Sequence, residues 1–136
     1  MANAIWREPA GNFEEQVVTV WGSFVIGASG AVLTVKGGGV LSVVKQATAG
    51  QYTITLNQQY SRLLWAECGA FSGSLMSVEH GAQLLANPAT LQASFASVPA
   101  LTFQFTDFNG AAANPPSGSV ATFKIDLRNS SVGPWD

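Results

Sequence analysis

Three segments alternate between apolar and polar side chains, and this pattern constrains the fold more than any other feature. They are residues 51–56 (QYTITL), 101–108 (LTFQFTDF) and 120–128 (VATFKIDLR). A period of two puts every second side chain on one face of a β-strand, so each segment predicts a strand with one face in a core. The side chains that we expect in this core are Tyr52, Ile54, Leu56, Leu101, Phe103, Phe105, Phe123, Ile125 and Leu127.

Other segments add shorter strands between turn residues. The further strands or hairpins expected are residues 17–26, 31–36, 40–46, 63–71, 74–78 and 91–98. A glycine triplet at 37–39 and the loop NGAAANPPSG at 109–118 are turn signals, and YSRLL at 60–64 suggests a short helical turn. No segment has apolar residues at helical spacing. The sequence therefore predicts an all-β fold, an antiparallel β-sandwich or jelly roll of about eight strands, with a barrel as a variant.

The expected domain organisation is one β domain at residues 16–136 preceded by an extended N-terminal arm at residues 1–15. The arm contains Pro9 and Gly11 and too few apolar residues to build its own core. We expect it to order on a partner, with the large aromatics near the two chain ends as anchors. The candidate partner-binding residues are Trp6, Phe13 and Trp135, although each tail could equally fold back on its own domain.

Composition excludes several functional classes. Charged residues make up 10 % of the chain, against about 25 % in typical soluble domains. The net charge is −2 and the six Lys and Arg residues form no basic stripe, which argues against nucleic acid. Residues 16–35 carry no charge, but their glycines and β-branched residues favour two strands over a membrane helix. The first residues do not resemble a signal peptide. A surface with so few charges favours association, so we expect the chain to pack against copies of itself or against a large partner.

No motif predicts catalysis, a metal site or a cofactor. Cys68 and His80 are the only thiol and imidazole, but Cys68 lies in an apolar segment and is expected in the core, with His80 in a solvated loop. The segment from Asp107 to Gly110 lacks most ligands of a calcium loop and is expected to be an ordinary turn. We expect Trp21 and Trp65 to be core residues. A sugar-binding alternative would instead expose Trp65 beside Glu67 on one strand face.

Three stretches together resemble a known class of protein. They are GQYTITLNQQYSRLL (50–64), LTFQFTDFNGAAANPPSGS (101–119) and FKIDLRNSSV (123–132). A strand G-x-Y-x-x-x-L, a turn with Tyr and paired Leu, and a late strand ending L-R-N-S-S resemble small virion proteins encoded in tailed-phage genomes. The resemblance covers roughly the C-terminal two thirds of the chain. It implies a β-rich virion component without catalytic activity.

The resemblance leads to a specific functional expectation. We expect a capsid cement or decoration protein on the outer surface of the head, binding the major capsid protein and copies of itself as a trimer or dimer. Many weak contacts, multiplied by avidity, would stabilise the shell. The alternatives are a tail or baseplate structural protein and a carbohydrate-binding β-sandwich of a fibre. Nucleic acid and membrane are not expected partners, and the chain is not expected to be an enzyme.

Overall fold

Eight antiparallel strands form one continuous, nearly closed sheet in the computed structural model, which describes residues 17–60, 62–86 and 99–128. In chain order the strands are β2 (Val17–Ile26), β3 (Val32–Lys36), β4 (Val40–Lys45), β5 (Gln51–Leu56), β6 (Arg62–Phe71), β7 (Gly81–Leu84), β8 (Ala100–Gln104) and β9 (Val120–Arg128). Their order in the sheet is β3-β2-β9-β6-β7-β8-β5-β4. The all-β prediction is thereby confirmed.

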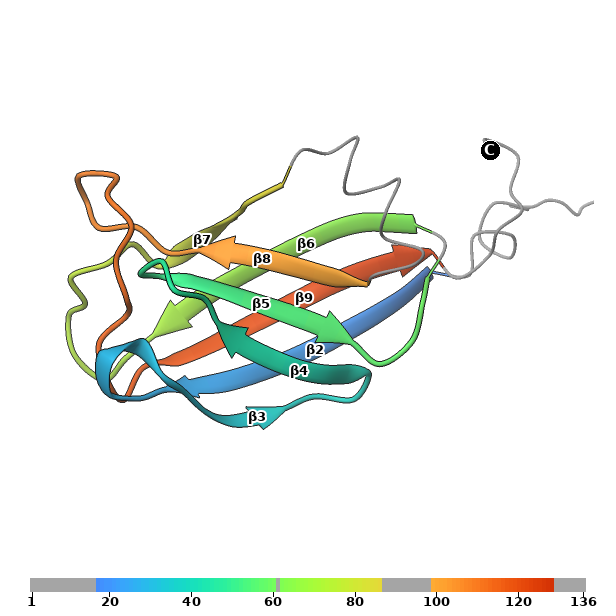
Figure 1. Cartoon of the computed structure of the whole chain (residues 1–136), viewed down its shortest axis with the longest axis horizontal. Coiled ribbons are helices and arrows are strands. Elements are labelled where there is room, and N and C mark those ends of the chain that lie inside the picture. The colour runs from blue at the N-terminus through green and yellow to red at the C-terminus, as the bar shows by residue number, and fades with distance from the viewer. Residues whose placement is uncertain (1–16, 61, 87–98, 129–136) are drawn as a thin grey trace, which may run out of the picture.

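The sheet folds over into two layers (Figure 1). Strands β4, β5 and β8 lie in front of β2, β9 and β6, and the short strand β7 pairs with both β6 and β8. Strands β3 and β4 are joined by a turn of three glycines and lie side by side at the open edge. The arrangement is that of a sandwich whose layers are continuous along one side.

The core between the layers is built from the inward positions of the alternating segments. All nine residues predicted for it are at most 2 % exposed. Tyr52 lies near its centre, with ring centroids 5.2 Å from Phe24 and 6.0 Å from Phe105. Its hydroxyl donates a 2.7 Å hydrogen bond to the backbone carbonyl of Gly30. Burial, and secondarily the nearby Cys68, raises the pKa of Tyr52 to about 12, so the phenol stays protonated at neutral pH.

Several predicted details are wrong. The helical turn expected at 60–64 is absent from the described residues, because β6 already begins at Arg62. Residues 74–78 form no strand and contribute only an isolated bridge between Val78 and Asp107. Strand β7 follows them, in a stretch where no strand was expected. The alternation of residues 120–128 puts Arg128 on the polar face of its strand, opposite Leu127, yet Arg128 is buried at 3 % exposure.

Some predictions concern residues outside those described. They are the N-terminal arm at 1–15, the candidate anchors Trp6, Phe13 and Trp135, and the strand expected at 91–98. Among the residues that are described, no helix is long and apolar enough to cross a bilayer. The partner-binding role of Trp6, Phe13 and Trp135 therefore stays a prediction.

Candidate functional site

The outer surface of the β2–β9–β6 layer carries two exposed tryptophans and a group of charged side chains. Trp21 is 62 % exposed and Trp65 is 58 % exposed. The core position expected for both residues is therefore wrong. We call this surface the tryptophan face and define it by the outward residues Thr19, Trp21, Trp65, Glu67, Thr122, Lys124 and Asp126.

Strand register explains why both indoles point outward. In β2 the buried residues Val20, Phe24 and Ile26 set the inward phase, so Trp21 belongs to the opposite face. In β6 the register shifts between Leu63 and Trp65, which turns Trp65 outward although Leu63 is buried. The outward position of Trp21 could have been predicted from the sequence, because Val20, Phe24 and Ile26 occupy the alternate, inward positions of the same strand. No sequence signal announced the irregularity that turns Trp65 outward.

Cross-strand pairing brings the polar residues of the face between the two indoles. Lys124 on the central strand β9 pairs with Trp21 on one side and with Glu67 on the other, while Asp126 pairs with Trp65. The Trp65 Nε1 group donates a 3.0 Å hydrogen bond to Glu67, which orients that indole. The Lys124 ammonium lies 5.4 Å from the centroid of the Trp21 ring, within the range of a cation–π contact.

A second carboxylate completes the group. Asp126 accepts a 2.7 Å hydrogen bond from the Thr19 hydroxyl and lies 3.8 Å from the Lys124 ammonium. Pairs as exposed as this contribute at most about 1 kcal/mol to stability. A contribution to stability this small does not account for the presence of the charged residues on this face.

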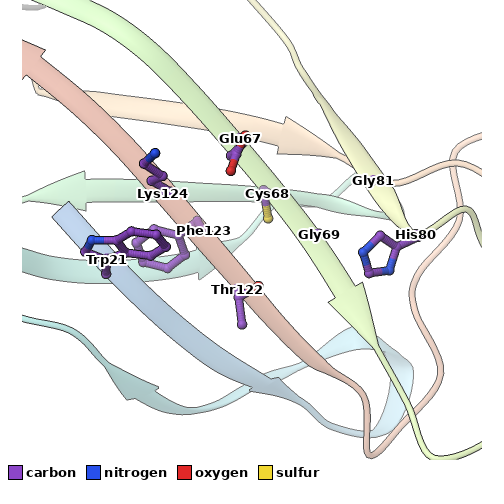
Figure 2. Close-up of a pocket in the computed structure, with 9 residues that line it drawn as sticks. All are labelled: Trp21, Glu67, Cys68, Gly69, His80, Gly81, Thr122, Phe123 and Lys124. Atoms are coloured by element: carbon purple, nitrogen blue, oxygen red, sulfur yellow. The ribbon is translucent and has the colours of Figure 1, made fainter. Parts of the chain in front are cut away.

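A shallow hollow of about 300 Å³ opens beside Trp21, on the outside of β9 and β6. Figure 2 shows Trp21, Lys124, Glu67, Thr122 and His80 around it. Two glycines, Gly69 and Gly81, pair across β6 and β7 and line the same hollow without side chains. A Cβ atom at Gly69 would lie 3.4 Å from His80 Nε2, whereas one at Gly81 would meet nothing within 4 Å. Neither position therefore fills the hollow with a side chain.

The thiol and imidazole predicted to be non-catalytic border this hollow. Cys68 is 6 % exposed, as expected for a core residue, and burial raises its thiol pKa to about 12. A thiol with that pKa is almost entirely protonated at neutral pH and is a poor nucleophile. His80 is exposed, as expected, and its backbone carbonyl accepts a 2.8 Å hydrogen bond from Ala70.

The calcium-like segment forms the ordinary turn that was expected. The Asp107 carboxylate accepts hydrogen bonds from the backbone N–H groups of Asn109 at 2.9 Å and Ala111 at 3.0 Å. Aspartate commonly closes turns in this way. Within the described ranges no three His, Cys, Asp or Glu side chains gather where they could hold a metal ion.

The opposite outer surface has a different character. The outward residues of β4, β5, β8 and β7 are uncharged, and we call this surface the neutral face. Its members are Ser42, Val44, Gln51, Thr53, Thr55, Gln83, Thr102 and Gln104.

Hydrogen bonds tie the side chains of the neutral face to one another. The hydroxyls of Thr53 and Thr102 share a 2.8 Å hydrogen bond, and Gln46 donates a further 2.8 Å bond to Thr53. Gln51 donates a 2.8 Å bond to the side-chain oxygen of Gln104. Much of the hydrogen-bonding capacity of this surface is therefore satisfied within the chain.

The two faces give the molecule two chemically distinct surfaces, one aromatic and charged, the other neutral. No family model, curated protein or solved structure matches the chain, so the interpretation of either surface rests on its own geometry.

Proposed function

We propose that the protein is a non-enzymatic structural component of a tailed-phage particle, and specifically a capsid cement protein that binds the outer surface of the head. The observation that carries this proposal is the neutral face. The outward side of an exposed antiparallel sheet is normally polar and solvated, and here the outward positions of four neighbouring strands are polar or apolar but never charged. Lys45 is the one charged residue of these strands. It stands opposite the buried Tyr52, and its ammonium donates a 3.0 Å hydrogen bond to the backbone carbonyl of Gln46.

A neutral face can be buried at low cost. Charges must be paired when they leave water, and the core of a protein interface is accordingly depleted of them. Here Thr53, Thr102, Gln51 and Gln104 already hydrogen-bond among themselves. A partner can cover them without leaving a buried ion or many unpaired donors. The partner proposed is the lattice of the major capsid protein, with further copies of this chain at neighbouring positions.

The exposed apolar side chains support the same role. Leu41 is 68 % exposed and Val44 is 51 % exposed at the β4 edge of the neutral face, and Leu33 on β3 is 55 % exposed. Exposed apolar residues that gather beside a neutral surface favour protein–protein contact. Contacts of this kind are individually weak, but a lattice repeats them many times and so retains the subunit through avidity.

A charge placed in the neutral face tests the proposal. Thr53 is the central residue of this face, flanked by Val44 and Thr102 on the neighbouring strands. We expect Thr53→Glu to weaken the binding of the purified protein to particles assembled without it by at least about tenfold, because the new carboxylate would be buried unpaired. Co-sedimentation over a concentration series measures the change.

The matched control places the same charge on the other layer. Ser23 faces outward on β2, between Lys36 and Thr122, and we expect Ser23→Glu to bind particles like the unaltered protein. Thermal unfolding of both variants shows that each is folded. Equal binding by the two variants would exclude the neutral face as the contact. Binding of the unaltered chain to purified tails instead of heads would favour the tail or baseplate role.

A further inference from the structure

The tryptophan face is not accounted for by a role in protein packing. Trp21 and Trp65 expose more than half of their surface, so most of each ring lies outside the core. Covering this face with another protein would desolvate Glu67, Lys124 and Asp126, which is costly unless each finds a partner. A ligand is needed that contacts indole rings while keeping these polar groups hydrogen-bonded.

The spacing of the two indoles describes the size of such a ligand. Trp21 and Trp65 lie on strands separated by β9, and their register positions differ by two residues along the sheet. The two indoles are two strand spacings apart across the sheet, which is roughly 10 Å. Along the strands they are two residues apart, which is roughly 7 Å. The ligand therefore extends over more than one ring-sized unit.

The groups between the indoles describe its polarity. The Glu67 and Asp126 carboxylates accept hydrogen bonds, the Lys124 ammonium donates them, and the Thr122 hydroxyl does both. His80 adds an exposed imidazole at the far side of the hollow. One cation among two carboxylates disfavours phosphate and other strongly anionic ligands. A ligand rich in hydroxyl groups, which both donate and accept, complements this set.

We propose that the tryptophan face binds a neutral oligosaccharide, with one sugar ring in the hollow beside Trp21 and the chain continuing towards Trp65. The apolar C–H faces of pyranose rings pack on indole surfaces, and their equatorial hydroxyls meet the carboxylates, the ammonium and Thr122. Gly69 and Gly81 leave the space that the ring in the hollow occupies. The protein thus carries a saccharide site that is separate from the neutral face.

Isothermal titration calorimetry of the full chain with maltohexaose, cellohexaose and chitohexaose tests the site. We expect at least one of these neutral oligosaccharides to bind, and we expect Trp21→Ala and Trp65→Ala each to weaken that binding by about tenfold or more. Both residues are exposed, so both variants should fold. Phe108→Ala is the matched control, because Phe108 is 67 % exposed in the turn after β8 and does not line the hollow.

A filling variant tests the hollow without removing an aromatic ring. Gly81→Leu places a side chain in open space at its edge and should weaken binding comparably, while leaving thermal unfolding nearly unchanged. The proposal is overturned if none of the three saccharides binds at millimolar concentration. It is equally overturned if the two tryptophan variants bind like the Phe108→Ala control, or if Gly81→Leu binds as tightly as the unaltered chain.

The saccharide site does not depend on the capsid role, and the two can fail separately. Thr53→Glu alters only the neutral face and should bind saccharide like the unaltered protein. Trp65→Ala alters only the tryptophan face and should bind particles normally. Loss of both activities in either variant would contradict the separation of the two surfaces.

Discussion

Replacing Phe103 with alanine is expected to lower the free energy of unfolding by about 3–5 kcal/mol. Phe103 is 1 % exposed in β8, where it pairs with Tyr52 on one side and Leu84 on the other. Removing its ring leaves a cavity between the layers that the surrounding strands cannot fully close, and the lost contacts add to the lost burial.

Urea unfolding followed by fluorescence measures this effect. Phe108→Ala is the control, since the same atoms are removed from a side chain that is 67 % exposed, and its effect should stay within about 0.5 kcal/mol. Similar losses in the two variants would mean that the inward phase of β8 is wrongly assigned.

Gly50→Ala is expected to be the most disruptive single-methyl addition in the turns. Gly50 has a φ of +75°, and a Cβ atom there would lie 2.5 Å from the backbone oxygens of both Ala113 and Phe105. Its N–H donates a 2.7 Å bond to the Asn114 side chain, and its carbonyl accepts one from the Phe105 N–H. The turn before β5 is therefore held against the loop after β8, and the methyl group would force them apart.

Gly110→Ala separates the two causes of that loss. Gly110 has a similar φ of +87°, but nothing lies within 4 Å of the position that the added methyl group would occupy. The free energy of unfolding of Gly110→Ala should therefore fall by only about 1–2 kcal/mol, because alanine is strained at a positive φ. Gly50→Ala should lose clearly more in the same denaturation measurement. Equal losses at the two positions would show that backbone conformation, and not close packing, determines both.

The alternating segments were predictable because a strand with one buried face must repeat every two residues. Residues 51–56 and 120–128 coincide with β5 and β9, and their apolar phase is the inward phase. These segments lie inside the sheet, with paired strands on both sides, so few other influences compete with the pattern.

The tryptophan face was predicted only in part, for a physical reason. The sugar-binding alternative exposed Trp65 beside Glu67, as the structure has them, but the preferred prediction placed Trp21 and Trp65 in the core. In residues 17–26 apolar side chains occur on both faces, so the composition of the segment suggests burial and hides the phase that exposes Trp21. In β6 a register shift reverses the phase next to Trp65, and such a shift depends on the partner strand β9. The sequence shows that Trp65 and Glu67 share one face of their strand. Whether that face points to the core or to solvent depends on how β6 pairs with β9.

The location of the chain in a purified phage particle tests the central claim most directly. Electron cryo-microscopy of particles that contain the protein should show a two-layered β-sandwich on the outer surface of the head, repeated with the capsid lattice. Its β4–β5–β8 layer should face the shell and its β2–β9–β6 layer should face solvent. Absence of this sandwich from the particle, or a position inside the shell, would contradict the proposed role.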